Sequence, residues 1–233
     1  NLLIMPFDFL LMIILIFKSI SFLRKNKINI LISTGGYMSL PLCIGAKILN
    51  IKLLLFEPNM VLGRSNKFFI SYCQKIFCYS NNVKKFPIKF KNKIKVIPAL
   101  LRKNFYDKRD SNNTLDTINL LIIGGSQGAK IFDDLVKNAI IELSKKYKLK
   151  IYQQTSSINF ESFKKTYENN NINCELFNFN DDVINFMQKT DLCITRAGAS
   201  TLAELNFNEI PYLAIPLPTA KDNHQFENAY FYN

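Results

Sequence analysis

The sequence of 233 residues has no tryptophan, a single histidine, only eight glycines, and five cysteines that form no Cys-x-x-Cys pair. So little glycine excludes a collagen-like chain, and an odd set of cysteines without metal-ligand spacing argues against a disulfide framework and a zinc site. Reduced thiols in a cytosolic protein are the simplest interpretation. With 48% hydrophobic residues, the chain can build one or two domains with real cores.

Acidic residues are scarce in the first half of the chain. Residues 1–110 hold 19 Lys and Arg against four acids, a charge of +15, whereas residues 111–233 hold 11 against 14, a charge of −3. A basic surface suits an anionic membrane, a phosphorylated substrate or a nucleic acid. We therefore expect the two halves to face different partners.

A hydrophobic run of about 20 residues, the length that spans a bilayer, is also missing. Residues 2–17 form the most hydrophobic stretch, but Pro6 and Asp8 interrupt it. Four basic residues follow it, whereas a secretory signal would carry them in front: Lys18, Arg24, Lys25 and Lys27. Three interpretations stay open: a helix packed on a sheet, an amphipathic helix in the membrane interface, and a helix that spans the membrane. The first two are favoured over the third, so we expect a peripheral rather than an integral membrane protein.

Short β-rich stretches alternate with longer helical ones. The expected strands are 28–32, 52–56, 76–79, 94–97, 118–123, 149–154, 174–177, 192–195 and 212–215. The expected helices include 129–146, 158–169, 183–189 and 201–208. Because the strands are apolar along their length, they predict two parallel α/β sheets that are covered on both faces and joined near residue 100. Ligands bind such sheets at the carboxyl ends of the strands, so the loops that follow the strands should carry the function.

Two of these loops, 124–128 and 196–204, combine small residues with the start of a helix. Glycine lets the backbone approach an anion closely, and a helix N-terminus supplies N–H groups and the positive end of its dipole. Ser200 or Thr201 is expected to cap the second helix. Either loop alone could be a packing turn or a cap, but two in one sheet predict a diphosphate ligand.

Three further loops carry polar side chains. Residues 216–225 bring amides and the histidine together, which suits hydrogen bonds to sugar hydroxyls. In the basic half, residues 33–39 and 56–59 follow strands and place hydroxyls, amides and a carboxylate at the end of the first sheet. Each of these loops taken alone is consistent with a plain turn.

The order and spacing of these motifs resemble the MurG family of UDP-GlcNAc:lipid I N-acetylglucosaminyltransferases. The matching motifs are G-G-Y-x-S from Gly35, E-P-N from Glu57, G-G-S-Q-G-A from Gly124, R-A-G-A-x-T-x-x-E from Arg196 and D-N-H-Q-x-x-N-A from Asp222. The resemblance implies a GT-B fold of two Rossmann-like domains, both incomplete here. Residues 1–101 would be the acceptor and membrane-facing domain, and residues 102–233 the UDP-GlcNAc-binding domain.

The resemblance also implies the reaction, an inverting transfer of GlcNAc to the MurNAc 4-hydroxyl of undecaprenyl-diphosphate-MurNAc-pentapeptide that gives lipid II. No metal or cofactor is implied. The partners would be UDP-GlcNAc, this acceptor lipid and the anionic surface of the bacterial inner membrane on its cytoplasmic face, with no nucleic acid.

Site residues follow by matching each motif position. The implied donor-binding residues are Asn59, Arg102, Gly125, Ser126, Gln127, Gly128, Asn180, Ala199, Ser200, Thr201, Glu204, His224, Gln225 and Asn228. The implied acceptor-side residues are Gly36, Tyr37 and Ser39, and Glu57 is the candidate general base, with a structural or binding role as its alternative.

The family's N-terminal Gly-rich loop with its histidine is not in this sequence, so the chain is interpreted as an internal fragment that is inactive by itself. One alternative is another GT-B nucleotide-sugar enzyme, such as a different glycosyltransferase or a UDP-GlcNAc 2-epimerase. A remote alternative, prompted by charge alone, is a nucleic-acid-binding module. The aromatic residues lie in apolar runs rather than among the basic ones, which disfavours a base-stacking surface.

Overall fold

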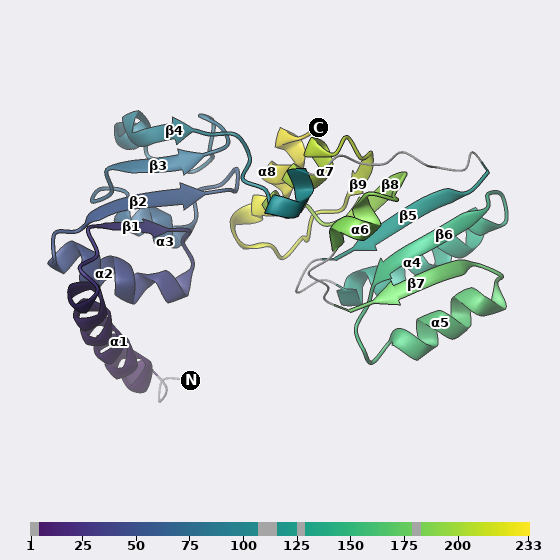
Figure 1. Ribbon diagram of the computed structural model, residues 1–233, viewed down its shortest axis with the longest axis horizontal. Helices are drawn as coiled ribbons and strands as arrows, with labels where there is room; N and C mark the ends of the chain where they lie inside the picture. Colours follow the sequence, from purple (N-terminus) through teal and green to yellow (C-terminus); the bar gives the residue numbers. More distant parts are fainter. Residues whose placement is uncertain (1–4, 107–115, 125–128, 179–182) are drawn as a thin grey trace. The chain divides into compact units, whose positions relative to one another are not determined.

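The computed structural model describes residues 5–106, 116–124, 129–178 and 183–233 (Figure 1). Its chain divides into two compact units, Asn1–Ala99 and Leu100–Asn233. The first unit holds a four-stranded sheet in the order β1-β2-β3-β4, and the second a five-stranded sheet in the order β7-β6-β5-β8-β9. Every strand pair is parallel. The predicted pair of parallel α/β sheets is therefore confirmed.

In the first unit a long helix comes before the sheet. The elements of this unit are α1 (Met5–Lys25), β1 (Ile30–Ser33), η1 (Tyr37–Ser39), α2 (Leu40–Ile48), β2 (Lys52–Glu57), α3 (Arg64–Phe69), β3 (Lys75–Cys78), η2 (Ile88–Lys93) and β4 (Ile94–Val96). Helix α1 packs against α2, and α2 contacts β1 and β2 (Figure 1). The first strand starts two residues later than expected, because Lys27 takes a positive φ and Ile28 still bonds back to Leu23 of α1.

The core of this unit explains why its strands are apolar. Leu53, Leu55 and Ile76 are completely buried between the sheet and its covering helices. Leu23 of α1 joins a smaller cluster with Ala46 of α2. In the described part of the chain, no helix combines the length and the apolar character that crossing a membrane requires.

The second unit contains twelve further elements in the described residues. They are η3 (Lys103–Tyr106), β5 (Ile118–Ile123), α4 (Ala129–Ser144), β6 (Leu149–Gln154), α5 (Phe160–Asn169), β7 (Asn173–Phe177), α6 (Val183–Met187), β8 (Leu192–Thr195), α7 (Ala199–Phe207), β9 (Tyr212–Ala214), η4 (Lys221–Asn223) and α8 (His224–Phe231). The strands lie within two residues of their predicted bounds. Long apolar runs locate buried parallel strands well, because both faces of such strands must be covered.

Both faces of the second sheet are indeed covered. Along β5, Leu120 and Ile122 join one core with residues of α4 and α5, whereas Leu121 and Ile123 join another with residues of α6 and α7. Side chains alternate between the faces of a strand, so a strand between two layers of helices must be apolar at every position. This sheet holds the loops after β5, β8 and β9 in place.

Candidate active site

The two predicted phosphate loops begin side by side. Ile123 and Thr195 are paired at the carboxyl ends of β5 and β8. The strand order reverses between these two strands. Strands β6 and β7 lie on one side of β5, whereas β8 and β9 lie on its other side. Open parallel sheets bind ligands at such a reversal. The predicted loop residues Gly125, Ser126, Gln127 and Gly128, and also Asn180, lie outside the described residues and stay predictions.

The loop after β8 is buried and leads directly into α7. Thr195, Arg196 and Ala197 are each less than a tenth exposed. The N-cap of α7 is Gly198 in an extended conformation, so the helix starts at Ala199. The expectation that Ser200 or Thr201 caps this helix is therefore wrong, because both lie within its first turn. Glycine has no side chain to cap the first N–H groups, which leaves them suited to an oxygen of a ligand.

Glu204, one turn further along α7, is paired with Arg102. The guanidinium Nε lies 3.1 Å from Oε1 and donates to it, and Nη2 donates to Oε2 at 3.3 Å. Burial raises the pKa of the Glu204 carboxyl, and the hydrogen bond and charge of Arg102 partly oppose this rise. Arg102 also lies over the ring of Phe105, 4.8 Å from its centre. The motifs predicted a ligand contact for each residue but missed their pairing, since 102 positions separate them.

The loop after β9 is closed by side chains of α8. Gln225 Oε1 accepts a hydrogen bond from the backbone N–H of Leu217 at 2.7 Å, and His224 Nδ1 lies 2.8 Å from the carbonyl oxygen of Lys221. A carbonyl only accepts, so Nδ1 carries a hydrogen in this contact, and in the tautomer with one ring hydrogen Nε2 keeps its lone pair. Asn228 is buried and donates to the carbonyl of Ala197 at 3.1 Å. Asn228 thereby ties α8 to the loop after β8.

In the first unit, Glu57 ends β2 with both carboxylate oxygens occupied. Oε1 accepts from the backbone N–H and the Nδ2 of Asn59 at 3.2 and 3.0 Å. Oε2 accepts from the N–H of Gly63 at 2.7 Å and from Nδ2 of Asn66 at 3.0 Å. A Cβ on Gly63 would lie 3.0 Å from Oε2, a tight contact, so glycine favours this close approach. Four donors from residues 59–66 on a side chain only 3% exposed suit a carboxylate that holds its own loop. The catalytic role of Glu57 stays a prediction.

The predicted acceptor-side residues lie on the turn that follows β1. Gly35 and Gly36 have φ values of 80° and 83°, a region that favours glycine. Ser39 Oγ donates to the carbonyl of Gly36 at 2.9 Å and lies 3.1 Å from Oγ of Ser65. Ser39 therefore joins the turn after β1 to the start of α3, at the carboxyl edge of the first sheet. Tyr37 is 66% exposed beside them.

Metal-binding side chains do not gather in the described ranges, where no group of three or more His, Cys, Asp and Glu has suitable geometry. The donors that the site offers to a ligand are instead backbone N–H groups, hydroxyls and the guanidinium of Arg102. Such donors suit phosphate and sugar oxygens.

Two family models match the chain, the glycosyltransferase family 28 N-terminal domain over residues 4–78 and the C-terminal domain of the same family over residues 119–232. A protein of Pelagibacter ubique is 88% identical to the chain over all 233 residues. It is named UDP-N-acetylglucosamine--N-acetylmuramyl-(pentapeptide) pyrophosphoryl-undecaprenol N-acetylglucosamine transferase. The chain spans 65% of the length of that relative.

Solved structures show the same relationship. The crystal structure of Acinetobacter baumannii MurG has a TM-score of 0.71 and 26% identity, over 93% of this chain and 61% of that one. A UDP-GlcNAc 2-epimerase from Neisseria meningitidis, bound to UDP-GlcNAc, has a TM-score of 0.63 over 91% of this chain and 65% of that one. Its 13% identity shows a shared fold alone, so the epimerase alternative is not favoured. The chain has a GT-B fold and belongs to the MurG family, within glycosyltransferase family 28.

Proposed function

We propose that the protein transfers GlcNAc from UDP-GlcNAc to the MurNAc 4-hydroxyl of undecaprenyl-diphosphate-MurNAc-pentapeptide, with inversion and without a metal. The observation that carries this proposal is the 88% identity, over the entire chain, to a relative named for this transfer. In the reaction the acceptor hydroxyl attacks the anomeric carbon and gives up its proton to a general base, while the bond to the diphosphate oxygen breaks and UDP leaves with that electron pair. The site must therefore stabilise negative charge on the diphosphate.

The second unit supplies groups for this task. We assign the diphosphate to the N–H groups of the first turn of α7, residues Ala199 to Thr201, together with the loop 124–128. Fixed dipoles aimed at developing charge need no reorganisation during the reaction, which makes them effective. Glu204 accepts hydrogen bonds from the ribose hydroxyls, and Arg102 orients its carboxylate and favours the ionised form against the effect of burial.

The GlcNAc moiety is assigned to the start of α8. His224 presents a ring whose Nδ1 is bonded to a backbone carbonyl, so that Nε2 can accept from a sugar hydroxyl. Gln225 is held by the loop 216–220 through its side-chain oxygen, and its amide NH₂ group can donate. Asn228 positions the loop after β8 through its hydrogen bond to the carbonyl of Ala197, rather than binding the ligand itself.

The acceptor is assigned to the first unit. Gly36, Tyr37 and Ser39 lie at the carboxyl edge of its sheet, where a ligand of an open parallel sheet is expected. Through its four hydrogen bonds, Glu57 keeps in place the loop that carries Asn59 and the start of α3 that carries Ser65. We therefore assign Glu57 a structural role in the acceptor site.

We further propose that α1 rests on the anionic cytoplasmic face of the inner membrane. Large apolar side chains are exposed along this helix, among them Phe9, Phe17 and Phe22. Four exposed basic residues lie on or just after the same helix: Lys18, Arg24, Lys25 and Lys27. Apolar side chains that enter the interface, with cations near anionic headgroups, are the combination that holds peripheral helices on membranes.

The transfer itself is tested with the full-length protein, radiolabelled UDP-GlcNAc and a lipid I analogue. The expected result is one labelled disaccharide lipid for each UDP released, also in the presence of a metal chelator. Formation of the 2-epimer of the sugar nucleotide, or release of UDP without labelled lipid, would contradict the proposal.

A further inference from the structure

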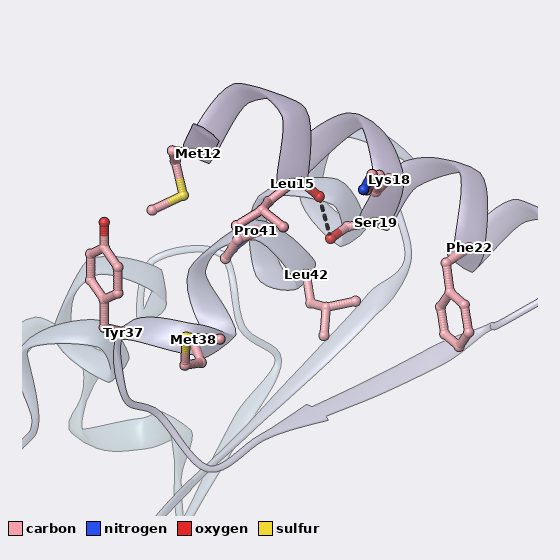
Figure 2. A pocket seen from close by; sticks show the side chains of 9 residues that line it. All are labelled: Met12, Leu15, Lys18, Ser19, Phe22, Tyr37, Met38, Pro41 and Leu42. Carbon is pink, nitrogen blue, oxygen red and sulfur yellow. Dashed lines mark hydrogen bonds between the residues drawn. The ribbon is translucent and has the colours of Figure 1, made fainter. Parts of the chain in front are cut away.

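An apolar groove of about 390 Å³ lies between α1 and the segment η1–α2 (Figure 2). Three elements line it with side chains that are almost all apolar. These are Met12, Leu15, Lys18, Ser19 and Phe22 of α1, Tyr37 and Met38 of η1, and Pro41 and Leu42 of α2. Figure 2 shows Tyr37 and Met38 on one side and Met12 and Leu15 on the other.

The two polar residues of the lining leave the groove apolar. Ser19 Oγ donates back to the carbonyl of Leu15 at 2.8 Å, within α1 (Figure 2). Lys18 is exposed and contributes a cation. Met38 is 81% exposed, although it lies among apolar neighbours. Exposed apolar surface that forms a hollow marks a binding site more often than scattered apolar residues do.

The groove adjoins the polar edge of the first sheet. The turn that supplies Tyr37 and Met38 to the groove also carries Gly36 and Ser39. A Cβ on Gly36 would meet no atom within 4 Å, so the space beside its backbone is open. Ser39 in turn bonds to Gly36 and contacts Ser65 at the start of α3. The groove is therefore apolar, has Lys18 in its lining, and lies next to the Ser39 hydroxyl and the Gly36 backbone. This combination suits a ligand with a hydrocarbon chain and an anionic head.

We propose that this groove binds the first isoprene units of the polyprenyl diphosphate acceptor, the part of the lipid tail next to its diphosphate. The inference rests on the proposed function, which supplies an undecaprenyl acceptor. It goes further by drawing the start of the tail out of the bilayer and into a protein site. An isoprenoid fits better than a phospholipid chain, because the same turn carries both the groove and the residues assigned to the acceptor.

Direct binding tests the groove without any need for catalysis. The probes are farnesyl diphosphate and inorganic pyrophosphate, titrated calorimetrically into the full-length protein. The wild type is expected to bind farnesyl diphosphate at least tenfold more tightly than pyrophosphate. Met38→Gln is expected to remove that advantage and to leave pyrophosphate binding unchanged. The matched control is Ile88→Gln, an apolar residue of η2 that is 84% exposed in the same unit and does not line the groove.

The proposal that the groove binds isoprene units would be overturned if the wild type bound both probes with equal affinity. It would also be overturned if Met38→Gln and Ile88→Gln lost equal affinity for farnesyl diphosphate. Phosphatidylglycerol vesicles separate it from a plain membrane contact. Met38→Gln should keep vesicle binding within twofold of the wild type. A vesicle loss as large as the farnesyl diphosphate loss would make this surface a bilayer contact and overturn the proposal.

Kinetics with acceptors of different tail length separate this inference from the proposed function. Met38→Gln should raise KM for a long-chain acceptor and leave KM for a five-carbon analogue unchanged. If the wild type transfers GlcNAc but the variant shows no dependence on tail length, the groove is wrong and the function stands. If farnesyl diphosphate binds as expected but no acceptor is glycosylated, the function is wrong and the groove stands.

Discussion

The two units share an architecture and differ in chemistry. Both are parallel sheets whose candidate ligand residues lie at the carboxyl edge. Residues 1–99 hold 15 Lys and Arg against two acids, a charge of +13, and expose large apolar side chains along α1, whereas residues 100–233 hold 15 against 16, a charge of −1. The sheet therefore decides where a ligand binds, and the loops and covering helices decide which ligand it is.

Two buried glutamates sharpen this comparison. Glu57 in the first unit receives four hydrogen bonds from residues 59–66, the segment that follows it. Glu204 in the second unit is paired with a half-exposed arginine from a distant segment, and burial raises the pKa of its carboxyl. A carboxylate whose acceptor positions are all filled by the segment that follows it supports structure, whereas one held by a half-exposed partner can exchange that partner for a ligand.

The largest expected effect concerns the charge difference between the units. Replacing Lys18, Arg24, Lys25 and Lys27 by Gln removes four cations, each worth about 1 kcal/mol at an anionic membrane. Partition onto phosphatidylglycerol vesicles should fall about 10³-fold at low salt, and by less at high salt because the charges are then screened. Vesicle sedimentation measures this partition.

Four exposed lysines of the second unit provide the matched control: Lys145, Lys146, Lys148 and Lys164. Their replacement by Gln should leave vesicle partition within about twofold of the wild type. An equal loss in both quadruple variants would show that net charge, and not the surface of α1, drives the binding.

The next effect is on stability. Glu57→Ala leaves buried N–H donors of its loop without an acceptor, so it should lower the free energy of unfolding by about 3 kcal/mol. Urea denaturation measures the change. Glu161→Ala, at an exposed position of α5, should change it by less than about 0.5 kcal/mol. A variant of Glu57 that keeps full stability but loses transfer would instead support its role as general base.

The smallest of the three effects is on nucleotide affinity. Glu204→Gln removes charged hydrogen bonds to the ribose worth about 1.5–3 kcal/mol, so calorimetry should show UDP binding weakened about 10- to 100-fold. Stability should change by no more than about 1 kcal/mol, because burial already disfavours the charged carboxyl. Glu168→Gln, exposed on α5, is the matched control and should leave UDP binding unchanged.

The raised pKa of Glu204 sets the sign of two pH dependences. UDP affinity should fall as the pH drops through this raised pKa, since the protonated carboxyl is a poorer acceptor. The free energy of unfolding should instead decline as the pH rises through it, because the folded state then loses a proton that it binds more tightly than the unfolded state does. Glu204→Gln should flatten both profiles. A variant with the wild-type profiles would assign them to another group.

Much of the fold was predictable because long apolar runs bounded by loops mark buried parallel strands. The strands 118–123, 149–154 and 192–195 have their predicted bounds in the structure. The predicted cap of α7 was wrong, because Gly198 occupies the N-cap position and Ser200 and Thr201 lie inside the helix. The family resemblance implied Glu204 and Arg102 separately, but no local pattern links positions so far apart.

The amino-acid sequence by itself determined the two parallel sheets, the charge contrast between the halves and the family, because these depend on patterns along the chain. The tertiary structure alone decided that Arg102 holds Glu204, that Glu57 is saturated by its own loop, and that α1 and η1 enclose a groove. These features come from contacts between segments that folding brings together. Hydrogen bonds and packing are set by distance in space, which spacing along a chain does not specify.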